Sequence, residues 1–194
     1  CMLDFPIREL AGKTLGIVGL GALGSGVAHV AKAFGMTVIA ARRPYRFTGP
    51  SSELLAVEGH GVTRVDWSHL LAESDVVSLH CPLNPETRHL IDREALQTMR
   101  PDALLINTAR GGLVNAADLV TALDNGIIAG AGIDVLEQEP PVAGDPLLDY
   151  RAANLIVTPH VSWAARESRQ RAIDEIAANV AAFLKGIRRN RVNG

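Results

Sequence analysis

A short apolar run that ends in three spaced glycines is the feature that most restricts how this chain can fold. The run Thr14–Val18 leads into Gly19, Gly21 and Gly24, and a helical pattern begins at once. A strand, a glycine turn and a helix in this order are typical of a dinucleotide-binding turn. Its glycines permit a tight turn, close approach of a pyrophosphate, and helix–strand packing, while the helix start offers free N–H groups. We therefore expect nucleotide binding here, although glycine turns also serve compact packing alone.

The helix expected after the glycine turn carries apolar residues at spacings of three and four. The series is Val27, Val30, Ala31 and Phe34, and this spacing predicts a stripe buried against the sheet. Gly35 is expected to end the helix, because glycine accepts the left-handed conformation that follows many helices.

Short apolar runs alternate with helical patterns along the whole chain. The runs predict strands at Leu15–Val18, Thr37–Ala41, Val62–Val65, Val76–His80, Ala103–Thr108, Ile128–Val135 and Leu155–Val161. Nearly continuous apolar runs such as Val76–His80 are expected for parallel strands that are covered on both faces. The repeated strand–helix units predict an α/β fold with a doubly wound parallel sheet of the Rossmann type.

Helices are expected between these strands and after the last of them. The patterns place them near Trp67–Ala72, Asp92–Met99, Asn115–Asn125 and Ala164–Lys185. Asn115 is a suitable N-cap for the third of these helices, and Gly126 is a suitable stop. The last helix is expected to bury a stripe made of Ile173, Ile176, Ala177, Val180 and Leu184. The segment Glu137–Asp149 is the one long irregular stretch, a kind of segment that often carries function.

The composition argues against several classes of protein. With 47% apolar and 4% aromatic residues, the 194-residue chain can bury a large core and is neither disordered nor fibrous. A net charge of −2 gives no electrostatic reason to expect nucleic acid or an anionic membrane as a partner. Two cysteines, Cys1 and Cys81, make no disulfide framework, and no run is long and apolar enough to span a bilayer. We expect a cytoplasmic protein that binds small molecules and needs no metal.

Ligands of a doubly wound sheet bind outside the carboxyl ends of its strands. Arg110 follows the predicted strand Ala103–Thr108 and precedes Gly111 and Gly112, which we expect to leave space for bidentate capture of a carboxylate. His160 can shuttle a proton near neutral pH, and a carboxylate such as Glu139 beside it would hold its tautomer and favour its charged form. Each residue alone also fits a plainer role, as a surface arginine, a satisfied polar histidine or a loop acid.

At these residues the chain resembles the nucleotide-binding domain of the D-isomer-specific 2-hydroxyacid dehydrogenases, especially the glycerate dehydrogenase and hydroxypyruvate reductase branch. The resemblance covers essentially the whole chain, with several spaced motifs in the family's order. The motifs are Gly19–Gly24, Leu79–Arg88, Ile106–Val114, Asp134-Val135 with Glu139-Pro140, and Pro159–Trp163. The resemblance implies a homodimer that reduces a 2-keto acid, such as hydroxypyruvate or glyoxylate, to the D-2-hydroxy acid with NADH or NADPH.

The resemblance also implies roles for single residues. Arg110 would bind the substrate carboxylate and carbonyl, His160 would be the acid and base, and Glu139 would orient His160. The resemblance places Cys81, Pro82, Thr108, Ala109 and Asp134 on the nicotinamide side of the cofactor. Together with the glycine turn and the two arginines after the second predicted strand, the residues expected to contact the cofactor are Gly19, Gly21, Ala22, Leu23, Gly24, Arg42, Arg43, Cys81, Pro82, Thr87, Thr108, Ala109, Arg110, Asp134 and His160.

Two departures from the family's pattern bear on function. Members place their substrate lobe mainly before this region, whereas this chain opens at Cys1–Pro6, which resembles the run into the first nucleotide-domain strand. We therefore expect a dinucleotide-binding domain at residues 1–186, a tail at residues 187–194 that would lead back to an absent lobe, and little turnover by this chain alone. Arg42 and Arg43 stand where NAD-using members usually carry an acid for the adenosine ribose. Two cations favour the 2′-phosphate of NADP, although an arginine can also stack on adenine in an NAD enzyme.

Two other functions stay open. The chain is also consistent with a non-catalytic module that senses dinucleotide, like the family's corepressor relatives, or with a silent fragment that serves only as a dimerising cofactor domain. Trp163 follows His160 at the start of the last helix. There it is either an exposed apolar group available to a dimer or a core residue.

Overall fold

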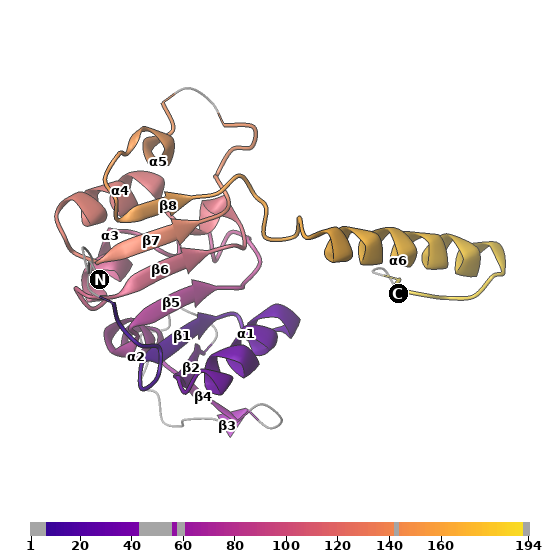
Figure 1. Ribbon diagram of the computed structural model, residues 1–194, viewed down its shortest axis with the longest axis horizontal. Coiled ribbons are helices and arrows are strands. Elements are labelled where there is room, and N and C mark those ends of the chain that lie inside the picture. Colours follow the sequence, from indigo (N-terminus) through magenta and orange to yellow (C-terminus); the bar gives the residue numbers. More distant parts are fainter. Residues whose placement is uncertain (1–6, 43–55, 58–60, 142–143, 192–194) are drawn as a thin grey trace. The chain divides into compact units, whose positions relative to one another are not determined.

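A sheet of eight strands organises the first part of the chain (Figure 1). The structure, a computed structural model, describes residues 7–42, 56–57, 61–141 and 144–191, and the chain divides into two compact units, Cys1–Pro159 and His160–Gly194. The strand order is β3-β4-β2-β1-β5-β6-β7-β8. The strands are β1 (Thr14–Val18), β2 (Thr37–Ala41), β3 (Ala56–Val57), β4 (Val62–Val65), β5 (Val76–Leu79), β6 (Leu104–Asn107), β7 (Gly130–Ile133) and β8 (Leu155–Val157).

The sheet is doubly wound, as predicted. Every neighbouring pair of strands except β3–β4 is parallel. The order changes direction at β1, which lies between β2 and β5, and this change makes the switch point at which ligands of such sheets bind. The sequence pattern does not predict β3, a two-residue antiparallel edge strand, because two residues are too few to show a period.

Helices connect the strands in the first unit. They are α1 (Ala22–Ala33), α2 (Trp67–Glu73), α3 (Arg93–Thr98), the 3₁₀ helix η1 (Gly111–Leu113), α4 (Ala116–Asp124) and α5 (Pro146–Asp149). The N-cap predicted at Asn115 is confirmed, since its side chain accepts a hydrogen bond from the Asp118 amide at 3.2 Å. The stop at Gly126 is confirmed by its φ of +65°. The segment predicted to be irregular contains α5, which Asp145 caps through the Leu147 amide at 3.0 Å.

The buried face of α1 differs from the prediction. Its buried residues are the small ones, Gly24, Ala28 and Ala31, whereas Val30 and Phe34 are 54% and 59% exposed. The helix begins directly on the glycine turn, where a Cβ on Gly24 would come within 2.2 Å of the Gly19 carbonyl oxygen. Because the backbone of α1 approaches the backbone of the turn here, only small side chains fit on the face of α1 toward the sheet, and the larger side chains lie on its other faces.

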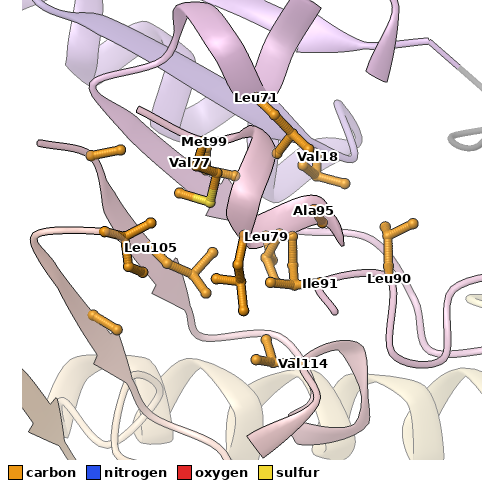
Figure 2. Packing of buried hydrophobic residues seen from close by; sticks show 14 of the residues in the cluster. Val18, Leu71, Val77, Leu79, Leu90, Ile91, Ala95, Met99, Leu105 and Val114 are labelled. Atoms are coloured by element: carbon orange, nitrogen blue, oxygen red, sulfur yellow. The ribbon is translucent and has the colours of Figure 1, made fainter. Parts of the chain in front are cut away.

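Apolar layers cover both faces of the sheet. Leu15 and Ile17 of β1 pack in the layer that includes buried alanines of α1, whereas Val18 packs in the layer that includes Leu70 and Leu71 of α2. This second layer extends over β5 and β6 and takes in α3 and α4, and Figure 2 shows part of it. The near-continuous apolar strands predicted from the sequence are thus explained by burial on two sides.

The second unit contains one helix, α6 (Arg166–Leu184). The stripe predicted for it is not buried: Ile173, Ile176, Ala177, Val180 and Leu184 are all exposed. The spacing correctly predicts a helix with an apolar face, but a single helix has no second layer within its own unit to cover that face. Trp163 is 58% exposed, so it is not a core residue.

Among the described helices, none combines the length and apolar character needed to cross a bilayer. The division into residues 1–186 and 187–194 stays a prediction, and residues 192–194 of that tail lie outside the described residues.

Candidate functional site

The three glycines of the turn have different physical roles. Gly19 has a φ of +102°, and a Cβ there would lie 2.6 Å from the Cys81 amide nitrogen, so this glycine lets the turn meet the end of β5. Gly24 allows α1 to pack on the turn. A Cβ on Gly21 would meet no atom of the described chain within 4 Å. The fold itself therefore does not require glycine at position 21, and the open space beside it is suited to a ligand that approaches the backbone.

A cavity of about 610 Å³ lies at the carboxyl ends of β5 and β6, next to the start of α1. It is lined by Leu23, His80, Cys81, Pro82, Leu83, Thr108, Ala109 and Arg110. This volume is within the range of small-molecule sites. The structure thus brings together the predicted residues Leu23, Cys81, Pro82, Thr108, Ala109 and Arg110 from three separate motifs.

Sequence reasoning missed two residues of the cavity wall, His80 and Leu83. His80 directly follows β5 at the ligand-binding edge of the sheet, which is the signal that could have identified it. Burial lowers the pKa of His80, and Ser78 Oγ lies 2.9 Å from its Nε2 atom. A neutral His80 leaves Arg110 as the charged residue on the cavity wall, so the cavity favours an anionic ligand.

Asn107 holds the loop that carries Arg110. Its side chain is fully buried at the end of β6. Asn107 Nδ2 donates to the Arg110 carbonyl oxygen and Asn107 Oδ1 accepts from the Ala109 amide, both at 3.0 Å. The exposed guanidinium of Arg110 donates from Nη1 to the Ala109 carbonyl oxygen at 2.6 Å. Asn107 is a polar residue inside an apolar strand, and this is the sequence signal that could have identified it.

The glycines after Arg110 do not leave space for a ligand, contrary to the prediction. A Cβ on Gly111 would come within 2.0 Å of the Leu136 carbonyl carbon, and one on Gly112 within 3.0 Å of Leu83 Cδ2. Gly111 is needed because the segment after β7 passes against the Arg110 loop. That segment carries Glu139, an exposed residue whose Oε1 accepts from the Leu136 amide at 2.8 Å. The structure therefore brings the Arg110 loop and the Glu139 segment together.

Two residues predicted to contact the cofactor are buried and do not line the cavity. Asp134 Oδ1 accepts from Thr158 Oγ1 at 2.5 Å. Thr87 Oγ1 donates to the Pro82 carbonyl oxygen at 2.7 Å and accepts from the Asn84 amide at 2.8 Å. Both side chains fix loops at the carboxyl edge of the sheet, and their direct contact with a cofactor stays a prediction.

His160 is the first residue of the second unit, whereas Arg110 and Glu139 belong to the first. The three predicted catalytic residues are therefore not assembled by one unit. His160 has a φ of +53°, in the left-handed region that residues other than glycine seldom adopt. Backbone of this kind often marks a functional position, so His160 remains a candidate proton donor.

Arg42 lies directly after β2, the position at which the sequence predicts a cation that could favour NADP. Its amide donates to the Val65 carbonyl oxygen at 2.8 Å, and its Nη1 atom lies 3.8 Å from Asp66 Oδ1. Arg64 donates from Nη1 to the carbonyl oxygen of Ala41 at 3.2 Å, so a second guanidinium lies at the same strand end. Arg43, the other predicted cation, lies outside the described residues.

These features fit a nicotinamide dinucleotide. Open space beside Gly21 suits a pyrophosphate, the cavity with Arg110 suits a nicotinamide and a small anionic substrate, and Arg42 follows β2, where an adenosine ribose would lie. Within the described ranges no group of histidine, cysteine, aspartate and glutamate side chains is arranged to hold a metal ion.

Comparison with known proteins gives a family. Residues 2–162 match the model of the D-isomer specific 2-hydroxyacid dehydrogenase, NAD binding domain. The glycerate dehydrogenase of Methylorubrum extorquens is 46% identical over 192 residues, which are 99% of this chain and 56% of that protein. The hydroxypyruvate reductase of Blautia hydrogenotrophica is 41% identical over 193 residues, which are 100% of this chain and 57% of that protein. The chain thus spans a little over half the length of these relatives.

A solved structure agrees with the sequence matches. The NAD-complexed D-isomer specific 2-hydroxyacid dehydrogenase of Lactobacillus delbrueckii ssp. bulgaricus superposes with a TM-score of 0.83 at 31% identity, over 96% of this chain and 58% of that one. The glycine turn, the sheet order and the strand-end residues therefore lie in a fold for which an NAD complex is known. The chain belongs to the D-isomer specific 2-hydroxyacid dehydrogenase family and carries that family's NAD-binding domain.

Proposed function

We propose that this chain is the cofactor-binding part of an oxidoreductase that reduces a small 2-keto acid, of the hydroxypyruvate or glyoxylate type, to the D-2-hydroxy acid. The observation that carries the proposal is Arg110 on the wall of a cavity that begins at the glycine-turn helix. A guanidinium at this position pairs with a carboxylate. The names of the two relatives, glycerate dehydrogenase and hydroxypyruvate reductase, support the substrate class.

The proposed roles follow from the chemistry of each side chain. The bound cofactor would supply the hydride. Arg110 would anchor the substrate carboxylate and polarise its carbonyl, so that it stabilises the negative charge that develops on oxygen. His160 would donate the proton to that oxygen, and Glu139 would hold the imidazole in the required tautomer. Asn107 would keep the backbone around Arg110 in place.

The proposal is tested by turnover in a longer protein of this family that contains the chain together with a substrate lobe. Oxidation of NADPH or NADH at 340 nm is measured with hydroxypyruvate, glyoxylate and, as a control, a 2-hydroxy acid in place of the keto acid. Reduction of the keto acids is expected, while the 194-residue chain alone, which spans 56% of the length of the glycerate dehydrogenase relative, should show little turnover. Cofactor binding without turnover in the longer protein would instead support a dinucleotide-sensing or dimerising module.

The cofactor preference is expected to lie toward NADP through Arg42. Replacing Arg42 by aspartate should shift the preference toward NAD by about 1–3 kcal/mol, because a charge-assisted contact with the 2′-phosphate is lost and a repulsion replaces it. The measurement is the ratio of the NADPH and NADH dissociation constants by fluorescence titration. Arg93→Asp, a change at an exposed arginine on α3, is the control. Tighter binding of NADH than of NADPH by the unmodified chain would contradict this assignment.

The chain is expected to form a homodimer. Trp163 and the apolar residues of α6 are exposed in the second unit, and they are available to a partner copy. Sedimentation equilibrium at micromolar concentration should give twice the 20.6 kDa chain mass. A monomer under these conditions would contradict the dimer. Location in the cytoplasm stays a prediction from the cysteine content.

A further inference from the structure

We infer that Asp66 is a specificity-determining residue that opposes the 2′-phosphate of NADP by holding Arg42. The inference rests on the proposed binding of a nicotinamide dinucleotide. No acid stands at the end of β2, where an NAD-specific site usually carries one. The parallel register of β2 and β4 supplies an acid from the neighbouring strand instead.

The register explains why the two residues meet. Ile39, Ala40 and Ala41 of β2 pair with Thr63, Arg64 and Val65 of β4. The next residues along the two strands are Arg42 and Asp66, and the bond from the Arg42 amide to the Val65 carbonyl oxygen continues the ladder to that point. The two side chains therefore leave neighbouring strands at the same level of the sheet.

Asp66 is held in place by the elements on either side of it. Its carbonyl oxygen accepts from the Leu70 amide at 2.9 Å in the first turn of α2. The next residue, Trp67, packs against the larger apolar layer. The side chain of Asp66 does not cap α2, and its Oδ1 atom lies 3.8 Å from Arg42 Nη1.

This distance lets Asp66 compete with a ligand without locking Arg42. It is within ion-pair range and beyond hydrogen-bonding distance, and both side chains are partly exposed, at 24% and 35%. Such a pair is weak, so it does not by itself keep the guanidinium from a phosphate. The carboxylate remains nearby and repels the phosphate, which carries close to two negative charges at neutral pH. The 2′-hydroxyl of NAD carries no charge and meets no such repulsion.

The test compares Asp66→Asn with the unmodified chain. Asparagine keeps the shape of aspartate but removes its charge. We expect NADPH to bind about three- to tenfold more tightly to the variant, while the dissociation constant for NADH changes less than about twofold. Glu73→Gln, which removes one exposed charge from the opposite end of α2, is the matched control and should change neither constant.

A double variant separates the competition for Arg42 from simple repulsion. In an Arg42→Gln background, Asp66→Asn should raise NADPH affinity by less than half as much as it does in the unmodified chain, because the ion pair no longer exists. Unchanged affinity for NADPH in Asp66→Asn, or an equal gain in Glu73→Gln, would overturn the inference while leaving dinucleotide binding intact. Failure of the unmodified, folded chain to bind either dinucleotide would overturn the proposed function together with it.

Discussion

Replacing Arg110 by alanine is expected to lower kcat/KM for keto-acid reduction about 10³-fold in a longer protein that contains this chain. Arg110 is proposed to bind the ground-state carboxylate and to stabilise the developing negative charge on the carbonyl oxygen, so KM should rise and kcat should fall together. His160→Ala should lower kcat with little effect on cofactor affinity, since His160 is proposed to act only on the transferred proton. The measurements are steady-state kinetics and cofactor titration for both variants.

Arg93→Ala is the matched control for the loss of an arginine. Arg93 lies at the start of α3, where its guanidinium is 3.7 Å from Asp118 and mostly exposed. This variant should keep its kcat/KM within about twofold, as surface substitutions usually do. If Arg110→Ala retained most of the activity while Arg93→Ala behaved as expected, Arg110 could not be the group that binds the keto acid.

Gly21→Val is expected to weaken dinucleotide binding by more than about 100-fold while the fold survives. Gly21 has a φ of −93°, which valine can adopt, and a Cβ there would meet no atom of the described chain within 4 Å. The added side chain would therefore begin in the open space proposed for the pyrophosphate. Titration with NADPH measures the effect, and circular dichroism and the Tm show whether the variant is folded.

Gly26→Val provides the same substitution farther along the chain, inside α1. A Cβ on Gly26 also meets no atom of the described chain within 4 Å, and the residue is exposed. This variant should bind the dinucleotide nearly as the unmodified chain does. A folded Gly21→Val protein with unchanged affinity would show that the glycine turn serves packing alone, which is the alternative that the sequence leaves open.

The sheet could be predicted from sequence because its strands bury both faces. Runs such as Val76–His80 are apolar at nearly every position, and their alternation with helical patterns allows few arrangements other than a doubly wound sheet. The ends of the strands are less predictable: the apolar run predicts a strand over Ile128–Val135, whereas β7 covers Gly130–Ile133. Apolar residues continue beyond a strand whenever the adjoining loop is buried, and Ile128 and Val135 are buried in this way.

Helix faces were harder to predict, for a reason of packing. Periodicity shows which residues of a helix share a face, but not which neighbour that face meets. In α1 the backbone lies so close to the glycine turn that alanine and glycine are buried and Phe34 is not. In α6 the apolar face is present, but its own unit offers no layer to cover it.

The site was predictable where a residue follows a strand and obscure where it acts through space. Arg110 and Cys81 follow strands at the edge where ligands bind, and both line the cavity. The contacts of Asn107 depend on the path of a loop, and the pairing of Asp66 with Arg42 depends on the register of β2 and β4, so a position at a strand end does not by itself reveal either. The prediction that Gly111 leaves space for a ligand is wrong for the same reason, because the segment that fills this space lies about 25 residues farther along the chain.

Titration of the unmodified chain with NADPH and NADH tests the central claim most directly. Enhanced fluorescence of the reduced nicotinamide would report binding in the proposed site, the cavity beside Arg110. We predict saturable binding of one dinucleotide per chain, with a dissociation constant of about 1–100 µM for the tighter cofactor, and displacement by the oxidised form. A folded chain that shows no saturable change with either cofactor up to about 1 mM would contradict the assignment of this chain as a working dinucleotide-binding domain.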